Sequence, residues 1–416
     1  MRRKWIRTNG WVFQVERSRG STTCRRWRDP VKITIVQGGA LPIPPVRGGA
    51  VEKVWFSLGR EFAKRGHEVT HISRTFSELP SEQWLEGVHH VRVKGFELSS
   101  KRYIALWRDL GYAARVLHVL PRADILVTNN PVLPLLIRTS QFGALYVHVA
   151  RYPKRQMRFY GHASRIQTVS QAAAEAIISQ APKIGGKVRV IPNPLPSAIC
   201  TLDVAASWQE RNKQILYVGR VHPEKGVHLL IDAFKLLVQS GVHGWRLIVV
   251  GPWAAAQGGG GEGYYQSLRA RRAPVVDMVN LLGPIFDPDV LAIHYRHAKL
   301  FVYPSLAEYG EAFGLAPLEA MAQGCPPLVS TLACFQDFIE NGRSGFIFNH
   351  RADRPEEELY RTLKTILSSD QELMSVAVRS HEVSRVYQSA NVAEMYLKDF
   401  AVIGAARRVP HNRVAQ

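Results

Sequence analysis

Short apolar runs alternate with amphipathic helical segments along most of the chain, and this alternation constrains the fold more than any other feature. The first run, VKITIVQGG at 31–39, is rich in β-branched residues and ends in two glycines, as a buried parallel strand does. Residues 50–66 then place apolar side chains at helical spacing and end in a glycine. Further strands are predicted at 67–73, 123–129, 144–149 and 165–170. This order predicts an α/β fold with a doubly wound parallel sheet.

The same alternation restarts after about residue 200, with a predicted helix that begins at Gly226. Strands are predicted at 213–220, 245–251, 275–283 and 299–305, and a loop at the glycine-rich stretch 251–263. A chain of 416 residues is too long for one ordinary core, so we expect two such domains. The predicted organisation is a basic extension at 1–30, domains at 31–198 and 199–385, a C-terminal helix at 386–404 and a basic tail at 405–416.

Positive charge is the unusual feature of the composition. Lysine and arginine total 54 against 34 acidic residues, and nine basic residues fall within 1–30. Such an excess fits nucleic acid, anionic lipid, phosphorylated substrates or simple solubility. The segment 1–30 lacks the continuous apolar stretch of a secretion signal, and the four cysteines lack metal-ligand spacing. We therefore expect a cytoplasmic protein.

The loops that follow the strands exclude a nicotinamide dehydrogenase. Such an enzyme carries G-x-G-x-x-G after its first strand and an acidic residue at the end of the second. Here the first loop runs from Gly38 to Pro42 without that pattern, and the second strand ends in His71, Ile72 and Ser73. The residues that bind a ligand are therefore expected in the loops of the second domain.

Arg220, Lys225 and Gly226 follow a predicted strand in the second domain. A guanidinium, an ammonium and the free backbone N–H groups of a helix start can together bind a phosphate or diphosphate. The alternative is that both cations are ordinary surface residues of a basic protein.

The stretch EAFGLAPLEAMAQGCPPLVS at 311–330 follows another predicted strand. Pro317 suits the first turn of a helix, and Gly314 allows backbone amides to approach an anion at the helix start. Glu319, expected in the first turn, can accept hydrogen bonds from a vicinal diol such as a ribose, and Glu311 can hold hydroxyls further along the ligand. The alternative is that Glu319 caps the helix and Glu311 is solvated.

VGRVHPEKGVHLLIDAF at 218–234 and PSLAEYGEAFGLAPLEAMAQGCPPLVS at 304–330 together resemble the family 4, or group 1, retaining glycosyltransferases of the GT-B fold. The E-x7-E motif of that family matches Glu311 and Glu319, and its phosphate-binding pair matches Arg220 and Lys225. The resemblance covers roughly residues 31–400. It implies two Rossmann-like domains that face a central cleft, with the acceptor side in the first domain and the nucleotide sugar in the second.

The first domain carries weaker parts of the same resemblance. Gly48 and Gly49 resemble the glycine-rich loop before the helix that faces the donor sugar, and His148 matches the histidine that points into the cleft. Judged without the resemblance, His148 is more simply a hydrogen-bonded core residue at the end of a strand.

The resemblance implies a hexosyltransferase that moves a hexose from a nucleotide diphosphate sugar with retention. Arg220 and Lys225 would stabilise the leaving diphosphate, with Glu311 and His148 also in the catalytic group. Glu319 would hold the ribose, and Gly48, Gly49 and the backbone of Phe313, Gly314 and Leu315 would contact the donor. No metal or other cofactor is expected. The expected acceptor is a glycan, lipid-linked or phosphorylated molecule, as in surface polysaccharide or glycoconjugate biosynthesis, and no nucleic acid is expected.

Several alternatives stay open at this point. A GT-B sugar-nucleotide epimerase or hydrolase would carry the same motifs, and a nucleic-acid-binding protein on a degenerate α/β scaffold would share the positive charge. The loop LAEYGE adds Glu308 as a second acid that can reach the sugar in place of Glu311. Asp287-Pro288-Asp289 is either a D-x-D metal motif or a helix N-cap.

The segment 100–120 mixes apolar residues with four cations. An apolar face bordered by cations can lie on an anionic membrane, whereas a crossover helix would pack the same face on the sheet. Together with the basic ends of the chain, it leads us to expect peripheral contact with the cytoplasmic membrane.

Overall fold

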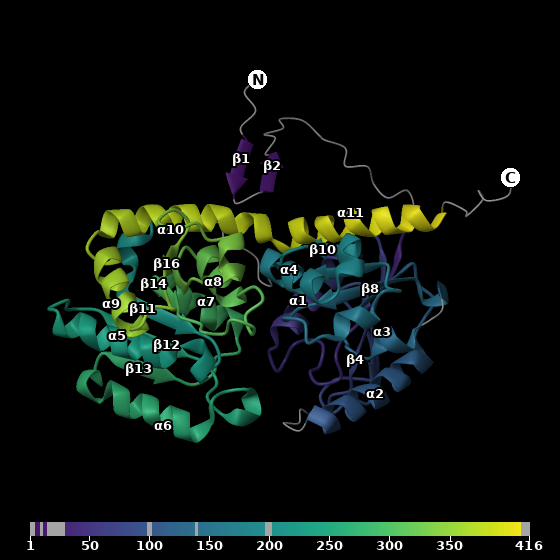
Figure 1. Cartoon of the computed structure of the whole chain (residues 1–416), viewed down its shortest axis with the longest axis horizontal. Coiled ribbons are helices and arrows are strands. Elements are labelled where there is room, and N and C mark those ends of the chain that lie inside the picture. The colour runs from purple at the N-terminus through teal and green to yellow at the C-terminus, as the bar shows by residue number, and fades with distance from the viewer. Residues whose placement is uncertain are drawn as a thin grey trace. The chain divides into compact units, whose positions relative to one another are not determined.

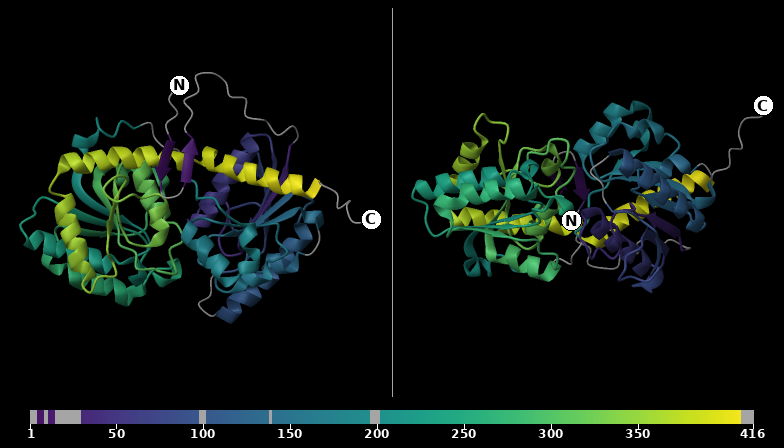
Figure 2. Two further views of the ribbon diagram at one scale, coloured as in Figure 1. Left: turned by 45° about the horizontal axis from the view of Figure 1, so that its top comes forward. Right: turned by 90° about the horizontal axis from the view of Figure 1, so that it is seen from below.

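The computed structural model describes residues 5–8, 11–14, 30–97, 102–137, 140–195 and 202–408. The chain divides into two compact units (Figure 1). The first unit comprises residues 17–196 and 388–416, and the second comprises 1–16 and 197–387. Each unit is built on its own largely parallel sheet with helices packed against it, as the further views in Figure 2 also show. The predicted α/β fold with two Rossmann-like domains is confirmed.

The sheet of the first unit has the order β10-β9-β8-β7-β3-β4-β6-β5. Its strands are β3 Lys32–Val36, β4 Glu68–Arg74, β5 Glu82–Leu85, β6 Val88–Val93, β7 Ile125–Thr128, β8 Ala144–Val149, β9 Arg165–Thr168 and β10 Val188–Val190. All neighbours pair in parallel except β5 and β6, which form an antiparallel hairpin that the sequence analysis did not predict. Glu86 and Gly87 both have positive φ, as a tight two-residue hairpin turn requires.

The helices of the first unit are α1 Ala50–Lys64, α2 Arg102–Val119, α3 Leu133–Leu136, α4 Gln171–Gln180 and α11 Ser389–Arg408. The apolar face of α1 is buried, and the chain turns away from the helix at Gly66 with a φ of 85°. The C-terminal helix α11 packs on α1, where the ring of Tyr396 contacts those of Trp55 and Phe62. It extends beyond the predicted end at residue 404, and residues 409–416 of the predicted tail lie outside the described residues.

The two halves of α2 differ in burial, and whether the helix contacts a membrane stays a prediction. In its second half, Tyr112, Ala113 and Val116 are fully buried in the core of the first unit. In its first half, Leu106 and Trp107 are 60% and 72% exposed. Within the part of the chain that the structure describes, no helix combines the length and hydropathy needed to cross a membrane.

The sheet of the second unit has the order β13-β12-β11-β14-β15-β16, and all its neighbours pair in parallel. Its strands are β11 Asn212–Val218, β12 Arg246–Val250, β13 Val279–Leu282, β14 Ala298–Tyr303, β15 Pro327–Ser330 and β16 Phe346–Phe348. Its helices are α5 Val227–Gln239, α6 Gly261–Arg272, α7 Pro288–His297, α8 Leu315–Ala322, α9 Pro355–Ile366 and α10 Asp370–Ser384. Two strands of the extension, β1 Trp5–Thr8 and β2 Trp11–Gln14, pair antiparallel, and the rest of 1–29 lies outside the described residues.

Two expectations for the second unit need correction. The predicted strand at 275–283 is shorter, because residues 273–275 form a 3₁₀ turn with Pro274 and only Val279–Leu282 pair with β12. The predicted loop at 251–263 contains a 3₁₀ turn at Ala255–Gln257, and α6 already begins at Gly261. The glycines there serve close approach, since a Cβ on Gly259 would lie 2.2 Å from the carbonyl oxygen of Trp253.

Candidate active site

The loop after β11 places two cations at the carboxyl end of the sheet. Arg220 follows the strand directly, and Lys225 ends a 3₁₀ turn, Pro223–Lys225. Gly226 then begins α5 with a φ of 69°. A Cβ on Gly226 would lie 2.0 Å from the carbonyl oxygen of Pro304, so only glycine lets this loop pack against the end of β14. That close approach brings Lys225 beside residues that follow β14.

Lys225 and Glu311 form a buried ion pair, with 2.6 Å between Nζ and Oε2. Their side chains are only 6% and 11% exposed. Oε2 also accepts hydrogen bonds from Tyr303, the last residue of β14, and from Ser305, two residues later. Each of these hydrogen bonds is 3.2 Å long. Burial and the nearby Glu311 carboxylate raise the pKa of Tyr303 well above its ordinary value, so Tyr303 stays a neutral donor. The carboxylate is therefore held in one orientation from three sides.

Arg220 lies at the rim of the same site and is 44% exposed. Its guanidinium donates to the carbonyl oxygen of Gly258 at 2.7 Å and to the carboxylate of Glu224 at 2.8 Å. The glycine-rich stretch after β12 thus positions Arg220, which the sequence analysis did not foresee.

α8 begins beside this pair with open backbone donors. Its N-cap is Gly314, which has a φ of 90° and contributes no side-chain cap. A Cβ on Gly314 would lie 2.5 Å from the ring of Phe335, so the position requires glycine on steric grounds as well. The side chain of Phe313 packs against Phe338. The first N–H groups of a helix have no intrahelical acceptors and favour an anion.

Glu319 lies in the second turn of α8, which corrects the prediction that placed it in the first. Gly314, with its positive φ, is the N-cap, so the helix begins at Leu315, two residues before Pro317. Glu319 is therefore the fifth residue of the helix. The alternative in which Glu319 caps the helix is wrong for the same reason. The carboxylate accepts a hydrogen bond from Tyr295 at 3.3 Å.

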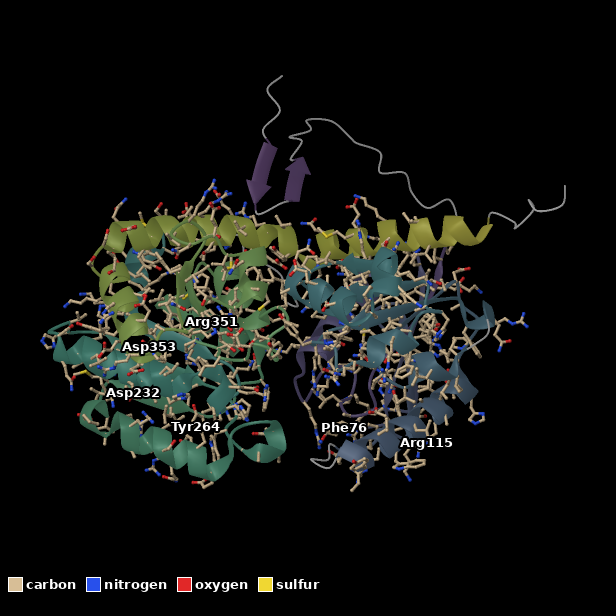
Figure 3. All side chains as sticks on the ribbon, viewed as in Figure 1. Phe76, Arg115, Asp232, Tyr264, Arg351 and Asp353 are labelled. Atoms are coloured by element: carbon tan, nitrogen blue, oxygen red, sulfur yellow. The ribbon has the colours of Figure 1, made fainter. Side chains whose placement is uncertain are left out.

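Glu308 and Glu311 have different partners, and which of them reaches a sugar stays a prediction. Glu308 forms a two-pronged ion pair with Arg351 at 2.7 and 2.8 Å, and it also contacts His350 at 2.9 Å; Figure 3 labels Arg351. The hydrogen bond from Arg351 lowers the pKa of Glu308. Only Glu311 contacts Lys225, so Glu311 is the acid of the cation site.

Asp287 is a helix N-cap. Its carboxylate accepts from the backbone N–H groups of Asp289 and Val290 at the start of α7. Across the described ranges, no group of three or more histidine, cysteine, aspartate or glutamate side chains is placed to hold a metal ion.

The remaining predicted residues, Gly48, Gly49 and His148, belong to the first unit. Gly49 is the N-cap of α1 with a φ of 97°, and a Cβ there would lie 2.2 Å from Oε2 of Glu52. His148, on β8, is 3% exposed, and its Nδ1 lies 2.5 Å from Oε1 of Gln167. Burial lowers the pKa of His148 to about 4, so its ring is neutral at pH 7. His148 is thus a buried, hydrogen-bonded residue, as the alternative without the resemblance required, and its role as a donor contact stays a prediction.

Sequence reasoning missed Tyr303 and Ser305, which orient Glu311. The signal was present in the predicted strand KLFVYPS, which ends with the polar residues Tyr303 and Ser305 at the edge where ligands of parallel sheets bind.

Comparison with known proteins agrees with this fold. Residues 202–380 match the family described as Glycosyl transferases group 1, and residues 47–198 match Glycosyltransferase Family 4. The chain is 22% identical over 370 residues to Spore coat protein SA of Bacillus subtilis, which covers 82% of this chain and 91% of that protein.

Two solved structures are similar in fold. Sucrose-phosphate synthase from Thermosynechococcus elongatus superposes with a TM-score of 0.73 at 17% identity, over 90% of this chain and 100% of that one. Anabaena HepE, solved in complex with UDP-glucose, gives a TM-score of 0.66 at 19% identity, over 89% and 100%. The fold is that of the GT-B enzymes. The chain belongs to the family 4, or group 1, glycosyltransferases and is a glycosyltransferase.

Proposed function

We propose that the protein transfers a hexose from a nucleotide diphosphate sugar, with retention of anomeric configuration, to a glycan or lipid-linked acceptor in surface polysaccharide or glycoconjugate biosynthesis. The observation that carries the proposal is the buried pair of Lys225 and Glu311 beside the start of α8. The complex of Anabaena HepE with UDP-glucose supports a nucleotide sugar as the donor.

The leaving diphosphate is the group with the greatest need for stabilisation, because negative charge builds on it as the bond to the sugar breaks. Lys225, already buried and oriented, and Arg220, at the rim, supply two positive charges. The open N–H groups at Gly314 and Leu315 supply further donors. These groups provide the charge compensation that a divalent cation supplies in other transferases, and we expect no metal requirement.

Glu311 would bind hydroxyls of the donor sugar through Oε1, since Lys225, Tyr303 and Ser305 all contact Oε2. Glu319, oriented by Tyr295, would accept from the two ribose hydroxyls. These two roles differ, because one carboxylate contacts the reacting sugar and the other only the nucleotide.

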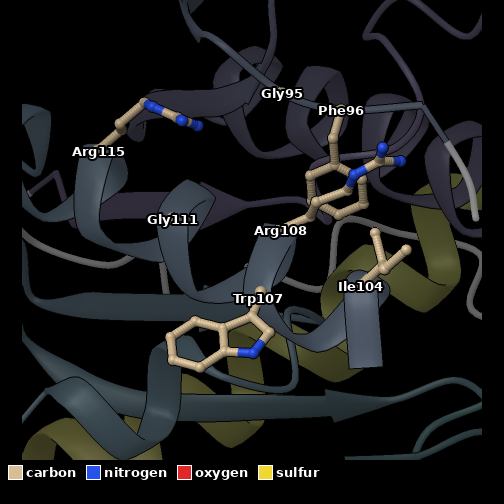
Figure 4. A pocket seen from close by; sticks show the side chains of 7 residues that line it. All are labelled: Gly95, Phe96, Ile104, Trp107, Arg108, Gly111 and Arg115. Atoms are coloured by element: carbon tan, nitrogen blue, oxygen red, sulfur yellow. The ribbon is translucent and has the colours of Figure 1, made fainter. Parts of the chain in front are cut away.

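We also propose that the protein contacts anionic membrane at its surface. The support is the first half of α2, where Leu106 and Trp107 are exposed and Arg108 lies beside them. An open groove of about 420 Å³ runs there between α2 and the chain after β6 (Figure 4). The groove is lined by the apolar side chains of Phe96, Ile104 and Trp107 and by the cations Arg108 and Arg115. Apolar side chains can enter the bilayer interface while cations bind anionic lipid headgroups.

A thermal-shift screen against UDP-, GDP-, ADP- and dTDP-sugars tests the donor. Stabilisation by one nucleotide sugar is expected, and stabilisation by none would refute the proposal. Product analysis with and without acceptor separates transfer from epimerisation or hydrolysis, and the anomeric signals of the product report retention. Chelator should leave the rate unchanged.

A further inference from the structure

A tight turn at 307–311 in the second unit carries Glu311. The backbone N–H groups of Gly310 and Glu311 both donate to the carbonyl oxygen of Ala307, each at 3.0 Å. Ala307 is buried, and Glu308 is the first exposed residue of the turn. The position of the Glu311 backbone therefore depends on what holds this turn against the rest of the unit.

The chain just before the turn is anchored by its backbone. The N–H of Leu306 donates to the carbonyl oxygen of Glu224, in the loop after β11, at 2.8 Å. The hydroxyl of Ser330, the last residue of β15, donates to the carbonyl oxygen of Ser305 at 2.6 Å. Both hydrogen bonds fix the chain before Ala307, so the turn itself is held by other contacts.

The loops after the two neighbouring strands supply those contacts. β14, β15 and β16 are adjacent and parallel, so the loops that follow them begin at the same edge of the sheet. Thr331 follows β15 directly, and His350 and Arg351 lie two and three residues after β16. From the turn after β14, the side chain of Glu308 reaches both His350 and Arg351.

These four side chains form a closed ring of hydrogen bonds. Arg351 donates through Nε and Nη2 to the two carboxylate oxygens of Glu308, at 2.7 and 2.8 Å. Nε2 of His350 lies 2.9 Å from Oε1 of Glu308, and its Nδ1 lies 2.9 Å from Oγ1 of Thr331. Nη1 of Arg351 closes the ring by donating to Oγ1 of Thr331 at 3.3 Å.

The donors and acceptors of the ring are consistent with one another. The ionised carboxylate of Glu308 can only accept, so Nε2 of His350 donates to it. Burial lowers the pKa of His350, so its ring is neutral at pH 7 and Nδ1 accepts from the hydroxyl of Thr331. The same hydroxyl oxygen accepts from Arg351. A network in which every member is satisfied fixes the positions of its side chains.

The ring is suited to hold the turn in place and not to stabilise the whole unit. The side chains of Glu308 and Arg351 are 40% and 52% exposed, and exposed ion pairs contribute little to stability. A guanidinium that binds both oxygens of a carboxylate nevertheless fixes their relative geometry. Both oxygens of Glu308 are engaged in this way, whereas the three partners of Glu311 all contact Oε2.

We propose that Glu308, Thr331, His350 and Arg351 form a clasp that holds the turn 307–311, and that they are positioning residues for Glu311. Glu308 then acts through the clasp and does not itself contact the sugar. The inference rests on the proposed glycosyl transfer, in which Glu311 binds hydroxyls of the donor sugar.

The test is a double-mutant cycle of Glu308→Gln and Arg351→Met. Each single variant breaks the two-pronged ion pair, so kcat for transfer should fall by roughly 10-fold, because a small displacement of a positioned group slows the reaction by that much or more. The double variant should lose no more than either single variant, since both changes remove the same interaction. Affinity for UDP, or for the nucleotide that the screen selects, should stay that of the wild type, because Lys225 and Glu311 remain paired.

A charge-swapped variant, Glu308→Arg with Arg351→Glu, rebuilds the ion pair with the carboxylate on the other loop. It should regain most of the transfer rate, which would be impossible if the Glu308 carboxylate bound the sugar. Glu340→Gln with Arg343→Met is the matched control, because this ion pair of the second unit is similarly exposed, at 46% and 54%. The control should transfer as the wild type does.

Hydrogen exchange at 307–311 gives a readout that needs no substrate. The N–H groups of Gly310 and Glu311 should exchange several-fold faster in both single variants, because the turn opens more often without the clasp. The charge-swapped variant and the control should exchange as the wild type does. The melting temperature should change little in all of them, since the pairs are exposed.

Loss of activity in Glu308→Gln without loss in Arg351→Met would overturn the inference and make Glu308 a sugar contact. The same conclusion follows if the charge-swapped variant regains slow hydrogen exchange and no activity. Wild-type exchange at Gly310 and Glu311 in both single variants would overturn it as well. If the wild type transfers no sugar, the proposed function fails, and hydrogen exchange still decides whether the clasp holds the turn.

Discussion

The polar edges of the two sheets satisfy their buried groups differently. In the second unit, Lys225 and Glu311 are buried and form an ion pair, and Tyr303 and Ser305 donate further hydrogen bonds to the Glu311 carboxylate. In the first unit, a row of neutral side chains crosses the sheet near its carboxyl edge, and each has a buried polar atom without a hydrogen-bond partner in the described part of the chain. The residues are Ser73, Gln37, Asn129 and His148. The difference follows from desolvation, because an unpaired buried charge costs far more than an unpaired amide or hydroxyl. A buried charge must therefore be paired within the fold, whereas a buried neutral group can remain unpaired at a smaller cost.

The largest effect is expected when both cations of the second unit are removed. Replacing Arg220 by Gln and Lys225 by Met should weaken binding of a nucleoside diphosphate by more than about 100-fold, because two charged hydrogen-bonding groups are lost at about 1.5–3 kcal/mol each. Calorimetric titration measures this. Lys213→Met, an exposed cation at the opposite end of β11, is the control and should leave the affinity unchanged. Unchanged affinity in the double variant would move the phosphate site elsewhere.

Glu311→Gln tests the carboxylate of the pair. Transfer should slow by roughly 10- to 150-fold, the value of one charged hydrogen bond. Glu319→Gln should mainly raise the donor concentration needed, because Glu319 is expected to hold only the nucleotide. Steady-state kinetics of both variants distinguish the two roles.

Glu311→Gln also leaves Lys225 without its carboxylate, so the variant should melt at a lower temperature. Adding Lys225→Met should restore part of the melting temperature and none of the activity. Wild-type kinetics in both glutamate variants would refute the assignment of the motif.

We expect the first unit to bind anionic membranes through apolar and cationic residues on its surface. Leu106→Ser with Trp107→Ser should weaken binding to anionic vesicles by about 10-fold or more, since a buried large apolar side chain is worth about 1.5–3 kcal/mol. High salt should release most of the wild-type protein, and deletion of 1–30 should weaken binding while donor binding stays intact. Sedimentation with neutral and anionic vesicles across a salt series measures both effects.

Trp84→Ser is the matched control, because Trp84 on β5 is 72% exposed, as is Trp107. Equal binding to neutral and anionic vesicles, or none at low salt, would make the positive charge a matter of solubility.

The smallest effect concerns pH. Burial lowers the pKa of His71 well below its ordinary value and lowers the pKa values of His90 and His148 to about 4. The unfolded chain takes up these protons near pH 6.5, so stability is complete above that pH and falls as pH drops toward 4. Burial raises the pKa of Asp109 to about 6, which acts in the opposite direction and offsets part of the loss.

His90→Leu should reduce the difference in melting temperature between pH 7.5 and pH 5 by a few degrees, on the scale of roughly 2–4 °C per kcal/mol. His90 is stacked on His71 at 5.5 Å between ring centroids, and after burial the nearby groups that lower its pKa are Arg92 and His89. His243→Leu, an exposed histidine of the second unit, is the control and should leave the difference unchanged. An unchanged difference in His90→Leu would refute this account of acid sensitivity.

The sequence predicted that Lys225 and Glu311 lie at one edge of the second-unit sheet. Arg220, Lys225 and Glu311 each follow a strand of one parallel sheet, so their meeting at one edge followed from the topology. Glu319 was placed one turn too early, because the positive φ of Gly314 cannot be read from its neighbours. The hairpin of β5 and β6 was missed, since strands of four and six residues with a charged turn give a weak pattern.

The sequence by itself determined the two-domain α/β fold and the family, and it predicted Arg220 and Lys225 as the cations of a phosphate site, because strand and helix periodicity and short motifs are local properties of the chain. Only the tertiary structure decided that Lys225 pairs with Glu311 and not with Glu308, and that Ser73, Gln37, Asn129 and His148 stand in one row. These facts depend on strand register and on close approach at Gly226, which join residues tens of positions apart. Register and close packing are decided by the whole sheet and its covering helices, and no local pattern encodes them.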